Sequence, residues 1–326
     1  LSLAAFLLAQ KESPGSTPER NWMLIAWSAA AGAVLSKGLI GVVIPSATLV
    51  IYSLLNRDLA PWRRLHIMPG VLLFLILAAP WFIAVTLRNP EFPNFFFIHE
   101  HFQRYTSTVH RRDEAPWYFV PILMIGLIPW IPLALHGLAG AWRSVAPPGQ
   151  FSAQRFLVVW CVFVLMFFSL SGSKLPAYLL PLFPALALLL GPYLCTAKRS
   201  FIQVTIALAI AISLLGLIGL PFALNARSES PLIALYRDYS KWLNVGFGVL
   251  GIAGLIAYFK AQQGQLKTAL TILGVGGFVS TMIGLHGHES LARSNSSAYL
   301  AEQIRPLLRA DIPMYSVKTY DQTLPF

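Results

Sequence analysis

The sequence predicts an all-α polytopic membrane protein that is followed by the start of a small water-soluble α/β segment. Of its 326 residues, 56% are hydrophobic and only 11% are charged, a composition typical of membrane proteins. Long apolar runs alternate with short polar loops, and the hydrocarbon core that such runs must cross is about 30 Å thick. After Gly287 the composition becomes polar. We therefore expect a transmembrane region over residues 1–287 and the beginning of an external soluble domain over residues 288–326.

Charge and cysteine content narrow the function classes. The net charge of +11 is spread over the loops without a run of five or more basic residues. This pattern argues against nucleic-acid binding and favours anionic head groups or phosphates as partners. Cys161 and Cys195 lie in or beside apolar runs, which indicates neither a disulfide framework nor a zinc site.

The two ends of the chain suggest a piece of a longer protein. The apolar stretch Leu1–Ala9 has no initiator Met and no basic flank, so it does not resemble a signal peptide. We expect it to be the tail of a membrane helix. The chain stops at Phe326 without a polar tail, and we interpret the whole as an internal fragment.

The apolar stretch Trp22–Leu55 is too long for one span. A single helix of its 34 residues would measure about 51 Å, so we expect a break at Ser36-Lys37-Gly38. The alternative is that Lys37 extends from a helix end toward the interface. Together with the spans below, this gives about nine full spans and a truncated first one. The remaining spans are expected at His66–Leu87, Trp117–Gly140, Phe156–Leu170, Leu175–Leu194, Phe201–Leu224, Trp242–Phe259 and Thr268–Leu285.

The last forty residues have a different pattern. Ser296–Arg309 has the apolar spacing of an amphipathic helix, with Ser296 or Ser297 as its cap. Ile312–Val317 is expected to form a strand. These two elements are the basis for the predicted α/β segment.

Alternation of the spans divides the polar segments between two faces. One face receives the loops Gln10–Arg20, Asn56–Arg64, Ala141–Arg155, Ala197–Ser200 and Lys260–Lys267, which carry 11 Lys and Arg residues. The other receives Lys37, the charged stretch near residue 100, Ser171–Lys174, Asn225–Lys241 and the C-terminal segment. The positive-inside rule favours the first face as cytoplasmic. The candidate chemical groups therefore share the external face.

The stretch Asn94–Tyr118 is the main candidate for a functional site. Its sequence, NFFFIHEHFQRYTSTVHRRDEAPWY, interleaves histidines, arginines and acids with aromatic residues between two apolar runs. Ionisable groups at a membrane are costly, so such a cluster indicates function. The alternative is a solvated connector with interfacial aromatic residues.

Three cationic features are predicted to meet on the external face: Lys37, Arg104 and Lys174. Arg offers a planar fork and Lys a compact charge, and both bind phosphate through charge-assisted hydrogen bonds. With lateral grooves beside proline-kinked helices, these residues suit a lipid phosphate. An anion transporter would use the same residues.

His99 and His101 flank Glu100, but their spacing excludes a helical His-x-x-x-His metal site. Contact of His99 with a phosphate or a backbone carbonyl is the simpler interpretation. Glu100 is a candidate acid or base, and equally an ion-pair partner for a neighbouring arginine.

Three separated motifs carry a family resemblance. They are Ser36-Lys37-Gly38-Leu-Ile-Gly41, the block Phe96–Tyr105 followed by His110 and Pro116-Trp117-Tyr118, and Ser173–Pro181. In this order they resemble the bacterial aminoarabinose-transferase-like glycosyltransferases, which are related to the protein O-mannosyltransferases. Both belong to the GT-C membrane glycosyltransferases. The resemblance implies a GT-C-like helix bundle.

The resemblance also implies an activity and partners. A member would move a sugar from a polyprenyl-phosphate carrier to lipid A or another envelope acceptor, on the periplasmic face of the bacterial inner membrane. Transfer to protein, as in the O-mannosyltransferases, is one alternative. A polyisoprenoid or anion transporter is another, but the internal repeats that would favour it are not evident.

Residue roles follow from the same resemblance. Lys37 and Arg104 would hold the carrier phosphate, with Tyr178 and Lys174 lining the site. His99, Glu100, His110 and Arg111 are candidate substrate or loop contacts. The family can place a divalent metal at His99, but its partner carboxylate is replaced here by Ser36. The catalytic Asp of the family would lie upstream of Leu1, so this fragment is expected to be inactive.

Overall fold

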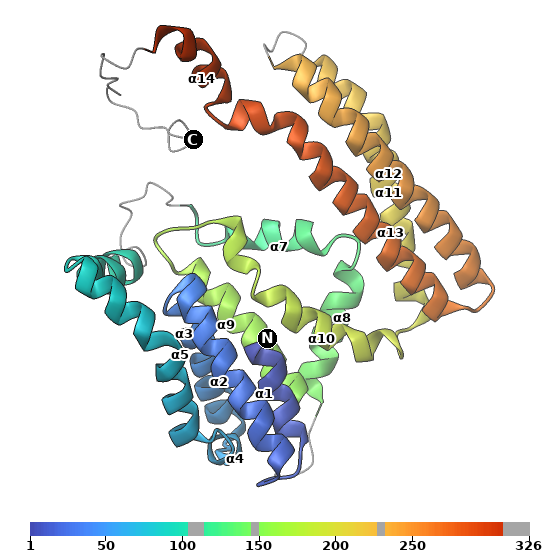
Figure 1. Cartoon of the computed structure of the whole chain (residues 1–326). Helices are drawn as coiled ribbons and strands as arrows, with labels where there is room; N and C mark the ends of the chain where they lie inside the picture. The colour runs from blue at the N-terminus through green and yellow to red at the C-terminus, as the bar shows by residue number, and fades with distance from the viewer. Residues whose placement is uncertain (104–113, 145–149, 227–231, 309–326) are drawn as a thin grey trace. The chain divides into compact units, whose positions relative to one another are not determined.

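Every regular element that the structure describes is helical (Figure 1). The structure is a computed structural model, and it describes residues 1–103, 114–144, 150–226 and 232–308. The chain divides into two compact units. Unit 1 comprises Leu1–Leu127 with Leu133–Thr196, and unit 2 comprises Ile128–Pro132 with Ala197–Phe326.

Unit 1 begins with the helices α1 to α5, of which α1, α3 and α5 pack against α2. The predicted break is confirmed, since α2 ends at Lys37, Gly38 has a φ of +83°, and α3 starts at Ile40. The elements of this unit are α1 (Ser2–Lys11), α2 (Thr17–Lys37), α3 (Ile40–Asn56), α4 (Ala60–Arg63), α5 (Ile67–Arg88), the π-helix η1 (Asn94–Gln103), α7 (Phe119–Leu127), most of α8 (Ile131–Arg143), α9 (Ala153–Ser169), the 3-10 helix η2 (Pro176–Leu179) and α10 (Leu182–Leu194).

A buried ion pair fixes one end of unit 1, which we call the Arg64 end. The Nε of Arg64 donates to Glu19 Oε1 at 2.8 Å, and Glu19 is only 1% exposed. The other guanidinium nitrogens donate to the backbone oxygens of Ala9, Gln10 and Glu12. Arg64 therefore donates to backbone carbonyl groups where α1 ends, and it joins α1 to the start of α2.

The same end of unit 1 also receives the start of α9. The hydroxyl of Tyr52 accepts the backbone N–H of Ser152 at 2.8 Å, and Arg155 donates to Asn56 Oδ1 at 3.0 Å. Arg155 also donates to Ser144 O. The loops predicted for one face near residues 10–20, 56–64 and 141–155 thus meet, as alternation of spans requires.

Unit 2 is dominated by three long helices, α11 (Arg199–Asn225), α12 (Ile233–Gln262) and α13 (Leu266–Gly287). Small residues let them approach closely: a Cβ at Gly276 would lie 2.2 Å from the Cβ of Ala253. Ser213 Oγ donates to Phe247 O at 2.6 Å across α11 and α12. Small residues and interhelical hydrogen bonds are the usual means of helix association in lipid.

Four described helices are long and apolar enough to cross a membrane: α5, α11, α12 and the helical stretch Leu266–Ala292. A fifth is added if α7 and α8, which are bent by 107° at their junction, count as one span. The predicted span Trp117–Gly140 is therefore divided. The expected total of about nine spans also counts shorter helices such as α3, α9 and α10, and it stays a prediction.

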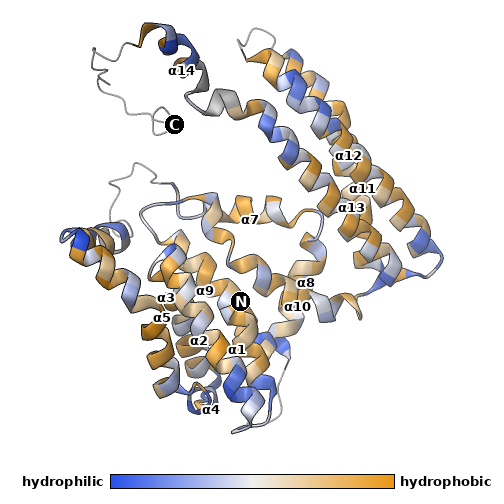
Figure 2. Ribbon diagram, viewed as in Figure 1, coloured by the Kyte–Doolittle hydropathy of each residue, from blue (hydrophilic) through white to orange (hydrophobic). Residues whose placement is uncertain are grey.

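Figure 2 shows hydrophobic residues along α5 and along much of α11–α13, with hydrophilic residues gathered at the loops. Leu72, Ile76 and Leu215 expose 61%, 59% and 71% of their surface, although they are large and apolar. Such exposure is stable only where lipid replaces water. The all-helical polytopic architecture predicted from the sequence is confirmed.

The polar C-terminal segment is helical as far as the structure describes it. The 3-10 helix η3 (His288–Asn295) is followed by α14 (Ala298–Ile304) and the 3-10 turn η4 (Arg305–Leu307). The predicted helix Ser296–Arg309 is therefore present but shorter. No α/β segment is seen in the described residues, and the predicted strand Ile312–Val317 lies outside them.

The Arg64–Glu19 pair gives a direct test of this fold. Arg64→Ala leaves a carboxylate buried without its partner, and breaking such a pair costs about 3–5 kcal/mol. We expect a correspondingly large fall in the unfolding midpoint in mixed micelles. Arg63→Ala, at an exposed neighbouring position, is the control and should change stability little. Equal effects of the two substitutions would contradict the assigned role.

Candidate functional site

Three of the predicted site segments lie at the end of unit 1 opposite Arg64. Contacts among residues 9–19, 52–64 and 144–155 place the starts of α2, α5 and α9 together at the Arg64 end. These helices have 21, 22 and 17 residues, so each extends roughly 25–33 Å away from that end. We call the opposite end the Lys37 end. It holds Lys37, the π-helix η1 after α5, and the turn Ser171–Lys174 after α9.

Lys37 is the last residue of α2, and its side chain is exposed. Gly38 ends the helix with a φ of +83° and a ψ of −162°, a conformation that is essentially restricted to glycine. The next helix begins only two residues later. The backbone therefore turns sharply beside the ammonium group and holds it where the apolar run ends.

Lys174 is buried, with 7% exposure, in the turn between α9 and η2. Its Nζ donates to Ser171 O at 2.8 Å. Within the described part of the chain, no carboxylate pairs with this ammonium group. A buried ammonium with one neutral acceptor is poorly compensated, so an anion beside it would be strongly stabilised.

The turn that carries Lys174 is closed by its own serines. Ser171 Oγ donates to Ser173 O at 3.1 Å and accepts the N–H of Ser173 at 3.3 Å. Ser173 Oγ is buried and has no hydrogen-bond partner among the described residues. Buried hydroxyls are normally paired, so this turn offers a second donor for an anion.

Tyr178 follows on η2 and is placed by aromatic packing. Its ring lies 4.9 Å from that of Phe168 on α9, and Phe168 in turn contacts Phe119 on α7. Two helices therefore fix the position of Tyr178 close to the turn of Lys174. The motif Ser173–Pro181 thus forms a turn and a short 3-10 helix, and the regular helix of the predicted span Leu175–Leu194 begins only at Leu182.

The π-helix η1 is attached to the end of α5 by aromatic rings. Phe82 contacts Phe96 at 5.3 Å, and Phe92 stacks on Phe96 at the same distance. His99 stacks on Phe95 at 5.5 Å and lines a surface hollow with Pro90, Glu91, Asn94, Phe95 and Ile98. The aromatic residues of this stretch therefore position its polar ones.

Part of the predicted site lies outside the residues that the structure describes. Arg104, His110 and Arg111 lie outside the described residues. Glu100 lies on η1 next to His99. Among the described residues, no group of three or more His, Cys, Asp or Glu side chains could hold a metal ion. The carboxylate that a metal at His99 would need is absent at Ser36, whose hydroxyl instead donates to Gly32 O.

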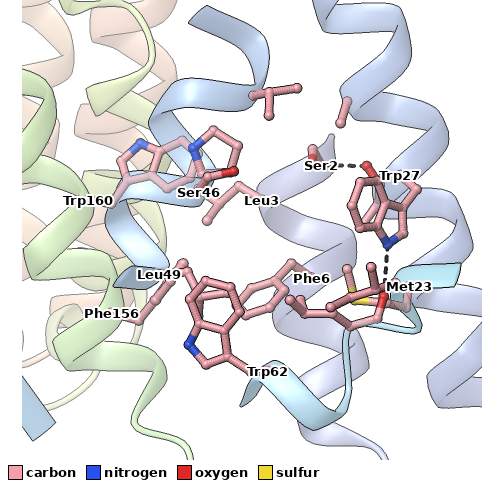
Figure 3. A pocket seen from close by; sticks show the side chains of 16 residues that line it. Ser2, Leu3, Phe6, Met23, Trp27, Ser46, Leu49, Trp62, Phe156 and Trp160 are labelled. Atoms are coloured by element: carbon pink, nitrogen blue, oxygen red, sulfur yellow. Dashed lines mark hydrogen bonds between the residues drawn. The ribbon is translucent and has the colours of Figure 1, made fainter. Parts of the chain in front are cut away.

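Sequence reasoning missed an apolar cavity in unit 1 (Figure 3). It has a volume of about 220 Å³ and lies among α1, α2, α3, α9 and the segment from α4 to α5. Its walls include Phe6, Trp27, Trp62, Phe156 and Trp160.

Two of the polar groups in the cavity wall are already paired. Trp27 Nε1 donates to Leu65 O, and Ser2 Oγ donates to Ala26 O. The cavity can therefore accept a hydrocarbon chain but offers little to an anion. Three tryptophans on separate helices were the only sequence signal for it, and tryptophan alone does not distinguish a cavity from an interfacial anchor.

Comparison with known proteins supports a specific relationship. No protein-family model matches the chain. The undecaprenyl phosphate-alpha-4-amino-4-deoxy-L-arabinose arabinosyl transferase of Edwardsiella ictaluri is 25% identical over 328 aligned positions, which cover 98% of this chain and 56% of the relative. The corresponding transferase of Aeromonas salmonicida is 34% identical over 192 positions, covering 58% of this chain and 34% of the relative.

Solved structures extend the similarity to the fold. ArnT from Cupriavidus metallidurans bound to undecaprenyl phosphate matches with a TM-score of 0.85 and 35% identity, over 99% of this chain and 58% of that one. The apo form of the same protein matches with a TM-score of 0.83. The chain thus spans a little over half the length of these relatives.

The turn at Gly38 gives a prediction about the geometry of this end. Gly38→Ala forces a Cβ into a glycine conformation at a cost of about 1–3 kcal/mol. Gly32→Ala in the same helix, where an added Cβ meets nothing within 4 Å, should be neutral or stabilising. Unfolding midpoints in mixed micelles compare the two. A Gly38→Ala variant as stable as the wild type would show that the turn is not fixed as described.

Proposed function

Because the chain belongs to the family of ArnT-like undecaprenyl phosphate-aminoarabinose arabinosyltransferases, we propose that it forms part of a membrane glycosyltransferase. The donor is a sugar carried on undecaprenyl phosphate, and the acceptor is lipid A or a similar envelope glycolipid. Transfer takes place on the external face of the bacterial inner membrane. The names of the relatives supply the donor and its sugar, and one solved relative binds undecaprenyl phosphate.

The observation that carries this proposal is the buried ammonium of Lys174, which no carboxylate of the described residues neutralises. It lies at the same end of unit 1 as Lys37, next to the hydroxyl of Ser173, for which the described part of the chain supplies no hydrogen-bond partner. A phosphate placed there would accept from donors that otherwise remain unsatisfied. Arg104, which follows η1 directly in the sequence, would add its planar guanidinium group as a bidentate hydrogen-bond donor to the same phosphate.

The chemistry of transfer explains why cations are needed at this point. The bond between the anomeric carbon and the phosphate oxygen breaks as an acceptor oxygen bonds to that carbon, through an oxocarbenium-like transition state. Negative charge grows on the departing phosphate, and the acceptor loses a proton. Fixed ammonium groups stabilise this charge more in the transition state than in the ground state, so they accelerate the reaction.

The proposal also covers the group that accepts the proton, the C-terminal segment, and two residues that follow Arg104. The carboxylate that takes the acceptor proton is assigned to the part of the relatives that this chain does not span, so the chain alone is expected not to catalyse transfer. Residues 288–326 are assigned to the beginning of an external α/β domain. His110 and Arg111 are assigned to substrate contacts near Arg104.

Carrier binding can be tested without catalysis. Lys37→Ala and Lys174→Met each remove one charge-assisted contact worth about 1.5–3 kcal/mol, so undecaprenyl phosphate should bind roughly 10- to 100-fold more weakly. Lys11→Ala, an exposed substitution at the Arg64 end, is the control and should leave the Kd unchanged. Binding to the chain in detergent micelles is the measurement. Unchanged affinity in both site variants would refute the phosphate assignment.

The role of Arg104 is best tested by measuring sugar transfer, in a protein that spans the full length of the relatives. Arg104→Ala should lower sugar transfer from a radiolabelled carrier by about 10²- to 10³-fold, because a transition-state contact is lost. Membrane insertion, measured by the yield of folded protein, should stay the same. Normal turnover of this variant would exclude Arg104 from the site.

A further inference from the structure

A second positively charged region lies in unit 2, at the end where α11 begins and α12 meets α13. Arg199 donates to Gln262 Oε1 at 3.0 Å, which joins the start of α11 to the end of α12. The tight turn Gln263–Gln265 then leads into α13, with Gly264 at a φ of +78°. We call this region the Lys260 end. Its cations are Lys198, Arg199, Lys260 and Lys267.

No acidic residue neutralises these cations within the helices that carry them. The sequence contains no Asp or Glu between residues 197 and 228 or between residues 239 and 288. At the far end of the same bundle, by contrast, Lys241 pairs with Asp238 at 2.7 Å. Lys198, Arg199 and Lys267 are exposed, and Lys260 is half-buried. The charge is therefore concentrated and accessible.

Helix polarity adds to this charge. The helices α11 and α13, of 27 and 22 residues, both begin at the Lys260 end, and neither has an acidic residue in its first turn or a side-chain cap. Unpaired N–H groups and the helix dipole give such ends a partial positive charge. The residues that usually offset this charge are replaced here by Lys198 and Lys267.

The Lys260 end also lies at the level of lipid head groups. Arg199 precedes the apolar run of α11 by one residue, and Lys260 follows that of α12 directly. Tyr258 and Phe259 are 43% and 62% exposed, just before Lys260. Exposed aromatic rings next to cations are typical of the membrane–water interface. Figure 2 shows hydrophilic residues at the α12–α13 turn next to the hydrophobic body of the bundle.

We propose that the Lys260 end binds the phosphodiester head group of an anionic phospholipid. Lys260 and Lys267 flank the turn and supply compact charges, and Arg199 borders the same surface through its bond to Gln262. The acyl chains lie along the exposed apolar side of α12. This site is in unit 2 and takes a structural lipid, so it is independent of the sugar carrier proposed for unit 1.

The site can be tested with a local probe. Gln263 is exposed within the turn, so a fluorophore attached to the thiol introduced by Gln263→Cys reports on this region. The Cys195→Ser substitution removes the exposed native thiol, while Cys161 is buried and should not react. The labelled chain is reconstituted in phosphatidylcholine vesicles that contain a few per cent of spin-labelled phosphatidylglycerol or spin-labelled phosphatidylcholine. We expect phosphatidylglycerol to quench the fluorophore at lower mole fraction.

Variants decide whether the preference belongs to this site. K260Q/K267Q should lower the preference for phosphatidylglycerol by about fivefold for each cation removed. K11Q/R63Q removes two exposed cations from unit 1 and should leave the preference for phosphatidylglycerol unchanged. Equal loss in both variants, or equal quenching by the two lipids in the parent chain, would overturn the proposal. Loss of the preference on adding inorganic phosphate, but not sodium chloride of equal ionic strength, would instead assign the site to a soluble phosphate.

Discussion

The ion pair between Arg64 and Glu19 sets the geometry on which the rest of unit 1 depends. A guanidinium group that bonds one carboxylate and three backbone carbonyls fixes where α1 ends, where α2 starts and where α5 enters. Charge at a membrane is tolerated where it is paired or where it reaches the interface. The buried charge at the Arg64 end is therefore paired, whereas among the described residues no carboxylate pairs with Lys37 or Lys174 at the opposite end.

The contrast between the two ends explains how a fold of apolar helices acquires a site for an anion. At the Arg64 end each buried charge has its partner. At the Lys37 end, counting the described residues alone, the ammonium of Lys174 has only Ser171 O as an acceptor and Ser173 Oγ has no hydrogen-bond partner. A buried ammonium group beside a hydroxyl without a partner is costly, so an anion that accepts from both would be stabilised at this end. A phosphate on a lipid carrier has the charge and the location that this end requires.

Much of this arrangement could be predicted from the sequence, because lipid leaves few choices. Hydrophobic run length predicted the break at Gly38, and alternation of spans placed Lys37, η1 and Lys174 on one face. The bend between α7 and α8 was not predictable, because prolines in lipid can either kink a helix or end it. Nor was the burial of Lys174 or the Arg64–Glu19 pair, since both depend on contacts between segments distant in sequence.

The most direct test of the account is the location of the carrier phosphate. A spin label attached at Ser36, next to Lys37, should strongly broaden the ³¹P resonance of bound undecaprenyl phosphate in a C195S chain. A label at Lys11, at the Arg64 end, should broaden it far less, because roughly 30 Å of helix separates the two ends. Equal broadening from both labels, or stronger broadening from Lys11, would contradict the claim that the Lys37 end holds the phosphate.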